Sequence, residues 1–127
     1  MLTGFETYVA SAREAALKIT KTGIVFNKAT ATRLGKPEYV ELGIDVSGKR
    51  IAIVRADKKT DLTFNFSLDP KTGLVKWGNK ELLKEIYKII ERDTEQSYRV
   101  IGEVYEKDRA IIFDLNQAQV IKGRCKL

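Results

Sequence analysis

The sequence predicts an α+β domain in which two strand–helix–hairpin units close one small β-barrel or two-layer core. The first observation is an echo, because KTGIVF at residues 21–26 returns as KTGLVK at residues 71–76. The second is that each copy is followed by a helical pattern and then by alternating apolar residues. A length of 127 residues suits one domain and can bury an apolar core without disulfides or metals. We therefore expect a single domain over residues 1–127, with pseudo-repeats at about 17–57 and 71–116.

The first unit joins a strand, a short helix and a hairpin. Residues 19–26 carry the apolar side chains of a strand. The segment NKATATRLG, residues 27–35, follows as a helix with Asn27 as its N-cap and Gly35 as its stop. Apolar and polar residues then alternate on both sides of the turn SGK, so a β-hairpin is predicted over residues 39–56.

The second unit repeats this order after a connecting strand. LTFNFSL, residues 62–68, places four apolar side chains on one face, which predicts a strand with one buried side. After the turn DPKTG, LVKW at residues 74–77 is strand-like, and Asn79 caps a helix with apolar residues at helical spacing. YRVIGEVY at residues 98–105 and RAIIFDL at residues 109–115 form the second predicted hairpin.

The two hairpins also echo each other, since Gly43 aligns with Gly102 and Arg50 with Arg109. Internal duplication is one interpretation, and chance resemblance between strand-rich sequences is the other. Each unit alone would leave one hairpin face unburied, so we expect the two halves to cover each other. The side chains expected in this shared core are Ile44, Val46, Ile51, Ile53, Val100, Val104, Ile111 and Phe113.

The chain's ends carry weaker patterns. Gln117 to Ile121 is predicted to add an edge strand, whereas the closing KGRCKL is too short and polar to fold alone. The single Cys125 cannot form an intramolecular disulfide, and the N-terminal segment lacks the pattern of a secretory signal. These observations predict a cytoplasmic protein that does not enter a membrane.

Charge provides the main indication of a partner. The 23 Lys and Arg residues outnumber the 17 Asp and Glu residues, for a net charge of +6. Residues 1–60 hold eleven basic and six acidic side chains, whereas residues 61–127 hold twelve and eleven. An anion-binding surface is therefore expected mainly in the first half. Charge alone leaves open nucleic acid, an acidic protein or an anionic small ligand, and also a merely solvated basic face.

Catalysis is not expected. The chain has no histidine, so the commonest neutral-pH general base and the imidazole metal ligands are missing. The carboxylate pairs Asp57/Asp61 and Asp108/Asp114 do not occur in a recognisable ligand spacing. The glycines form no phosphate-binding run. We therefore predict a non-enzyme without cofactor or metal.

Residues 19–56 resemble the swapped-hairpin domain of AbrB-type transition-state regulators and MazE-type antitoxins. The resemblance is carried by TGIVFNKATATRLG and YVELGIDVSGKRIAIVRAD. FNK at residues 26–28 stands where such domains start their helix with an IPK-like sequence, and Leu34 and Gly35 match the helix end. PEY at residues 37–39 replaces the acidic GD that is common before the hairpin. The whole chain is also similar to small uncharacterised proteins of phages and mobile elements of Gram-positive bacteria.

This resemblance implies DNA binding by the basic face of an interlocked dimer, which the two halves of one chain would mimic. Carried over by position, the residues that it implies lie on the first strand, the first helix and the hairpin. They are Lys18, Lys21, Lys28, Arg33, Arg50 and Arg55. Arginine suits base edges because its fork can engage guanine at two atoms, whereas lysine mainly neutralises phosphate.

Aromatic residues beside basic ones in the second half indicate an alternative face for a partner or ligand. Stacking and charge together could hold a base or nucleotide, although such aromatics are more often core residues. Trp77 is expected at a pocket rim, because it lies between a strand and the entry to the helix. The alternative face comprises Lys76, Trp77, Lys80, Arg99 and Arg109.

Three functions remain open from the sequence. The leading one is a DNA-binding regulator of AbrB-like type. The second is an inhibitor from a phage or mobile element that binds a host defence protein or sequesters a nucleotide signal. The third is a structural module that forms homo-oligomers.

Overall fold

A computed structural model describes residues 14–91 and 95–121 of the chain. The described part is rich in strands and has two α-helices, α1 and α2. The strands and α-helices, in chain order, are β1 (Ala16–Thr20), β2 (Gly23–Phe26), α1 (Lys28–Arg33), β3 (Tyr39–Asp45), β4 (Arg50–Ala56), β5 (Thr63–Asn65), β6 (Val75–Trp77), α2 (Lys80–Ile90), β7 (Ser97–Tyr105), β8 (Ala110–Asp114) and β9 (Gln119–Ile121).

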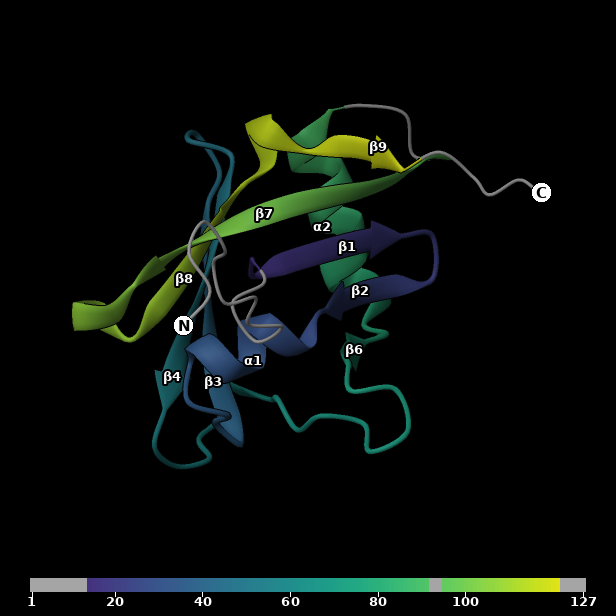
Figure 1. The fold of residues 1–127 in the computed structure, drawn as a ribbon. Helices are drawn as coiled ribbons and strands as arrows, with labels where there is room; N and C mark the ends of the chain where they lie inside the picture. The colour runs from purple at the N-terminus through teal and green to yellow at the C-terminus, as the bar shows by residue number, and fades with distance from the viewer. Residues whose placement is uncertain (1–13, 92–94, 122–127) are drawn as a thin grey trace, which may run out of the picture.

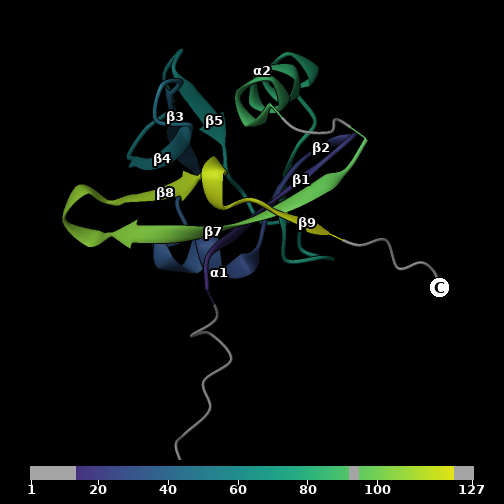
Figure 2. The same cartoon turned by 90° about the horizontal axis from the view of Figure 1, so that it is seen from above.

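All nine described strands belong to one antiparallel sheet. Its order is β5-β3-β4-β8-β7-β1-β2-β6, and β9 pairs with β7 beside this path. The sheet curls into a half-barrel (Figure 1). Seen from above, α2 lies in the angle between the part of the sheet formed by β3, β4 and β5 and the part formed by β1, β2 and β7 (Figure 2). The buried core fills the space between α2 and the sheet.

Both helices begin at the predicted caps. The Asn27 Oδ1 accepts a 3.0 Å hydrogen bond from the Thr30 N–H, and the Asn79 Oδ1 accepts one of 3.0 Å from Leu82. Such bonds satisfy N–H groups that the first helical turn leaves without partners. Gly35 follows α1 with a φ of 83°, a left-handed conformation that favours glycine. The cap and stop predictions for α1 and the cap prediction for α2 are therefore confirmed.

The predicted order of elements is also observed. Each expected helix follows a strand and precedes a hairpin, and β9 forms near the predicted C-terminal edge strand. The whole segment KGRCKL, residues 122–127, which includes Cys125, lies outside the described residues. The expected first strand is in fact a hairpin of β1 and β2, turning at Lys21 and Thr22. The Thr20 hydroxyl accepts from the Gly23 N–H and donates to the Gly23 carbonyl, so it closes this turn.

The core prediction is correct for five of its eight residues. Ile51, Ile53, Val100, Ile111 and Phe113 are almost completely buried, and Val104 is half-buried against the core. The predicted burial of the remaining two, at the tip of the β3–β4 hairpin, is wrong. Ile44 is 39% exposed and Val46 66% exposed.

The exposed positions follow from how far the neighbouring strand extends. β5 pairs only with Tyr39 to Glu41 of β3, so the end of the hairpin has no strand on that side. β5 itself is shorter than the predicted strand over residues 62–68. Both ends of the predicted strand lie outside β5, where Phe66 is buried as expected but Leu62 is 71% exposed.

Strands that the sequence echo makes equivalent pair with each other. β2 pairs with β6 and β4 with β8, both antiparallel. An antiparallel pair of equivalent strands is what a two-fold axis between the units would require. The two units differ in length and in their other neighbours, since β3 lies beside β5 whereas β7 lies beside β1. The duplication stays a prediction.

The two glycines aligned by the echo are expected to respond differently to alanine. Gly102 lies where β7 changes partner from β1 to β8. A Cβ there would lie 2.6 Å from Ile111 Cγ2 and 2.7 Å from Phe113 Cε1, both side chains being fully buried. Gly102→Ala should therefore lower the free energy of unfolding by about 1–3 kcal/mol through overpacking.

Gly43→Ala is the matched control, because nothing lies within 4 Å of the position its Cβ would take. It should leave stability unchanged or raise it by up to about 1 kcal/mol, since alanine restricts the unfolded chain more than glycine does. Urea denaturation of both variants measures the difference. Equal effects of the two substitutions would contradict the packing described for Gly102.

Candidate nucleic-acid interface

The strand register brings three basic side chains into one row across the sheet. Lys18 of β1 lies opposite Arg99 of β7 on one side and opposite Val25 of β2 on the other. Val25 in turn lies opposite Lys76 of β6, and Arg99 lies opposite Gln119 of β9. Directly opposed residues point to the same face of a sheet. The row Arg99, Lys18 and Lys76 is called the basic row below.

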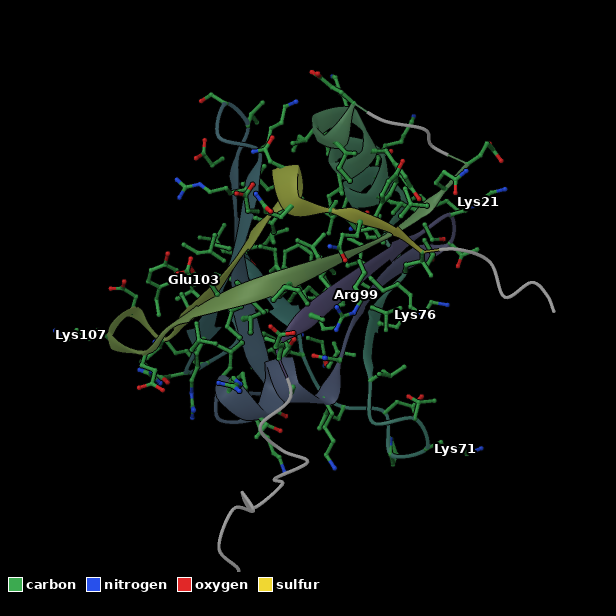
Figure 3. The ribbon with its side chains drawn as sticks, turned by 45° about the horizontal axis from the view of Figure 1, so that its top comes forward. Lys21, Lys71, Lys76, Arg99, Glu103 and Lys107 are labelled. Carbon is green, nitrogen blue, oxygen red and sulfur yellow. The ribbon has the colours of Figure 1, made fainter. Side chains whose placement is uncertain are left out.

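The basic row lies on the solvent side of the sheet. Lys18, Lys76 and Arg99 are exposed. The residues on either side of each, which are Leu17, Ile19, Val75, Trp77, Tyr98 and Val100, are buried on the opposite side. Figure 3 shows Arg99 over the middle of this part of the sheet and Lys76 at its β6 edge. Since α2 packs behind these strands (Figure 2), the basic row faces away from the helix.

No carboxylate neutralises the basic row in the described part of the chain. The ion pairs recorded there join Lys21 to Glu95, Lys49 to Glu91, Arg50 to Asp45 and Arg109 to Asp57. None of them includes Lys18, Lys76 or Arg99. Lys18 and Arg99 are moreover direct cross-strand partners, and like charges in that position destabilise a sheet. The fold alone gives no reason for such a pair, which makes this face a candidate for binding an anion.

Two further lysines lie at the ends of this surface. Lys21 occupies the β1–β2 turn, where its Nζ lies 2.7 Å from Glu95 Oε1. Lys28 opens α1, and its side chain lies beside the turn at Gly73. Along β7 the charge reverses, because the exposed Glu103 follows Arg99 towards the β7–β8 turn (Figure 3). The basic surface is therefore confined to the part of the sheet formed by β1, β2, β6 and the first half of β7.

Three predicted arginines gather elsewhere, between the end of α1 and the β7–β8 turn. Arg33, Arg55 and Arg109 line a depression of about 150 Å³. The Arg55 Nη1 donates a 3.0 Å hydrogen bond to the Leu34 carbonyl at the end of α1, where a positive charge is favourable. The hydrogen bond from Arg109, with its charge, lowers the pKa of Asp57 below the usual range. Arg55 and Arg109 thus have structural roles at this junction.

Arg50 also has a partner within the fold. Its Nε and Nη2 both donate to Asp45 Oδ2, at 3.2 and 2.9 Å, across the end of the β3–β4 hairpin. The backbone N–H of Gly48 and then Arg50 lower the pKa of Asp45. Lys80, from the alternative set, lies on α2 behind the sheet and away from the basic row. The predicted nucleic-acid-binding residues and the predicted alternative set therefore do not form two separate faces of the protein.

Trp77 is a core residue and does not form a pocket rim as expected. Its side chain is only 8% exposed. Its ring stacks on Phe64 at a centroid distance of 4.7 Å and meets the edge of Phe26 at 4.8 Å. The indole Nε1–H donates a 2.9 Å hydrogen bond to the Asn65 carbonyl. Strand alternation explains this placement, because Lys76 takes the exposed position of β6 and Trp77 the inward one.

Sequence reasoning named all three residues of the basic row but divided them between two faces. Lys18 was assigned to the first half, and Lys76 and Arg99 to the second. Gln119, which extends the row onto β9, was missed. The available signal was local alternation along each strand. It indicates that Lys18 and Ile19 point to opposite faces of the sheet, as do Arg99 and Val100. The register that joins these strands does not follow from the sequence pattern.

A search of protein-family models, of curated protein sequences and of solved structures finds no significant match to this chain. The resemblance to AbrB-type domains therefore stays a prediction. Neither helix in the described ranges is long and apolar enough to cross a membrane. Within those same ranges, no group of three or more acidic or cysteine side chains is arranged to hold a metal ion.

Proposed function

We propose that this chain is a non-catalytic DNA-binding protein that contacts the phosphate backbone through the basic row. The observation that carries the proposal is the unneutralised row of Lys18, Lys76 and Arg99, with Lys18 and Arg99 directly opposed across two strands. Phosphate groups between these side chains would replace repulsion with attraction. The net charge of +6 adds long-range attraction to any polyanion.

Duplex DNA suits this face better than a single strand held by base stacking. Proteins that bind single strands without sequence preference combine basic grooves with aromatic platforms. Among the described residues, the aromatic side chains next to the basic row, Tyr98 and Trp77, point into the core. From Arg99 to Lys76 the row crosses three strand spacings, about 14 Å. It is long enough to contact several phosphates along one backbone.

The finer identity of the protein remains part of the proposal. A transcriptional regulator of AbrB-like type would also read base edges, for which Arg99 is the best placed candidate in the row because of its guanidinium fork. Lys21 and Lys28 would extend the phosphate contacts at the two ends of the surface. Arg33, Arg50 and Arg55 are not needed for this mode of binding.

Duplex binding measured at two salt concentrations, about 50 and 200 mM, tests the proposal. The wild-type chain should bind a labelled mixed-sequence duplex, with an affinity that falls steeply as salt rises. Replacing Lys18, Lys76 and Arg99 together by Gln should lower the magnitude of the salt slope by about 2–3 units, because each lost phosphate contact removes roughly one. Fluorescence anisotropy gives both affinities.

The matched control replaces Lys58, Lys59 and Lys107 by Gln. These lysines are exposed and form no recorded ion pair, and Lys107 lies at the far end of β7 (Figure 3). The control carries the same charge change, so it should lose only the small non-local part of the attraction. Equal losses in both variants would reduce the effect to net charge and overturn the assignment of the basic row. Absence of binding by the wild type at low salt would overturn DNA binding itself.

A further inference from the structure

A second basic surface lies on the helix side of the molecule. Lys80, Lys84 and Lys88 occupy positions i, i+4 and i+8 of α2 and are all exposed. Together with the β1–β2 turn they border an open groove of about 1000 Å³. The groove is called the α2 groove below. The lysines of α2 lie on the other side of the sheet from the basic row, because α2 packs behind β1 and β2 (Figure 2). Lys21, in the β1–β2 turn, lies where the two surfaces meet.

The floor and walls of the α2 groove are held in place by the core. Leu83 and Tyr87 form its floor and are each 8% exposed. The Tyr87 hydroxyl donates a 2.8 Å hydrogen bond to the Gln96 carbonyl, which ties α2 to the start of β7. On the opposite side, the pair of Lys21 and Glu95 at 2.7 Å joins the β1–β2 turn to the same segment. The groove is therefore a shaped surface with an apolar floor.

The three lysines along this groove lie on one side of α2, where Glu81 and Glu85, three residues before Lys84 and Lys88, offset only part of their mutual repulsion. Like charges four residues apart repel each other on a helix surface. None of Lys80, Lys84 and Lys88 has an ion-pair partner in the described ranges. Two carboxylates line the groove, but Glu95 is engaged by Lys21, and Glu81 lies in the first turn of α2, where a negative charge stabilises the helix. Within the described ranges, the three lysines therefore form no ion pair and leave the groove bordered by a row of positive charge.

We propose that the α2 groove docks an acidic amphipathic helix of a partner protein. Successive lysines are about 6 Å apart along α2, which equals the step between acidic residues four positions apart on a second helix. The apolar floor at Leu83 and Tyr87 would accept the apolar residues beside that acidic row. This mode matches helix-in-groove recognition. A nucleic-acid backbone supplies the charge but no apolar side chains, so a protein segment fits the groove better.

A designed peptide tests the docking without knowledge of the natural partner. The probe is a labelled helical peptide of about 18 residues, five helical turns, with Glu at every fourth position on one face and Leu beside it. A peptide of the same composition, shuffled so that Glu and Leu no longer share a face, is its control. The full-length wild-type chain should bind the first peptide at least tenfold more tightly than the second. Equal affinities would overturn the proposal.

Variants of both basic surfaces complete the test. Replacing Lys80, Lys84 and Lys88 by Gln should lower the affinity for the amphipathic peptide at least tenfold and leave the affinity for duplex DNA nearly unchanged. Replacing Lys18, Lys76 and Arg99 by Gln should have the opposite pattern, so failure of DNA binding and failure of peptide docking are distinguishable. Peptide affinity that survives in the α2 variant would overturn the proposal. So would a loss of duplex binding in that variant at unchanged peptide affinity, because the groove would then belong to a nucleic-acid surface. Melting curves confirm that each variant is folded.

Discussion

A chain that ends at Asp57 is expected to be unfolded or to associate with a second copy. The cut removes β6, β7 and β8, which are the partners of β2, β1 and β4 respectively. The side chains that these strands and α2 cover would return to water, at roughly 1.5–3 kcal/mol for each large apolar side chain. A whole domain is stable by only about 5–15 kcal/mol. Losing several such contacts exceeds that margin.

Circular dichroism, two-dimensional NMR and sedimentation of the fragment measure the outcome. The control is a chain that ends at Ile121, which keeps every described strand and helix and should melt close to the full chain. A well-dispersed NMR spectrum from a monomeric fragment ending at Asp57 would show that the first unit folds independently. It would remove the argument that the two halves need each other. A folded dimer of the fragment would instead support the interpretation that the second unit replaces a second copy of the first.

Trp77→Ala is expected to lower the free energy of unfolding by about 3–5 kcal/mol, the usual cost of deleting a buried aromatic side chain. The ring contacts Phe26, Phe64 and Phe66, and these contacts join β6 to β2 and to the β5 region. Its removal also leaves the Asn65 carbonyl without the indole N–H that lies 2.9 Å away. Trp77→Phe should cost less, because most of the ring packing remains.

The control for this substitution is Leu62→Ala. Leu62 is also a large apolar residue of the second half but is 71% exposed, so its loss should change stability by no more than about 0.5 kcal/mol. Urea denaturation compares the three variants. The binding hypothesis for Trp77 makes the opposite prediction, namely normal stability with lost ligand binding. Normal stability of Trp77→Ala would contradict the core role of Trp77 and support a role in binding.

Local patterns were sufficient for most elements of this fold. Asn27 and Asn79 identified both helix starts, because a cap depends only on a side chain and the backbone two or three residues later. Alternation identified both hairpins, and apolar spacing identified α2. The β1–β2 turn was missed although the polar residues Thr20 to Gly23 separate Ile19 from Ile24, and the Thr20 hydroxyl closes this turn. Ile44 and Val46 were assigned to the core because alternation reports which face a residue is on, but not whether that face is covered.

The candidate interface depended on information of a different kind. Net charge and local alternation, both properties of the sequence alone, determined that the protein has exposed basic side chains on strands. Only the tertiary structure decided that Lys18 meets Arg99, 81 positions further along the chain, and that Lys76 joins the same row. Pairing between distant strands is selected by the burial of the whole opposite face, because a shift by one residue would turn every core side chain towards water. The apolar residues beside each basic side chain thus decide which face of the sheet that side chain takes. The basic side chains of distant strands become neighbours only when the entire sheet has formed.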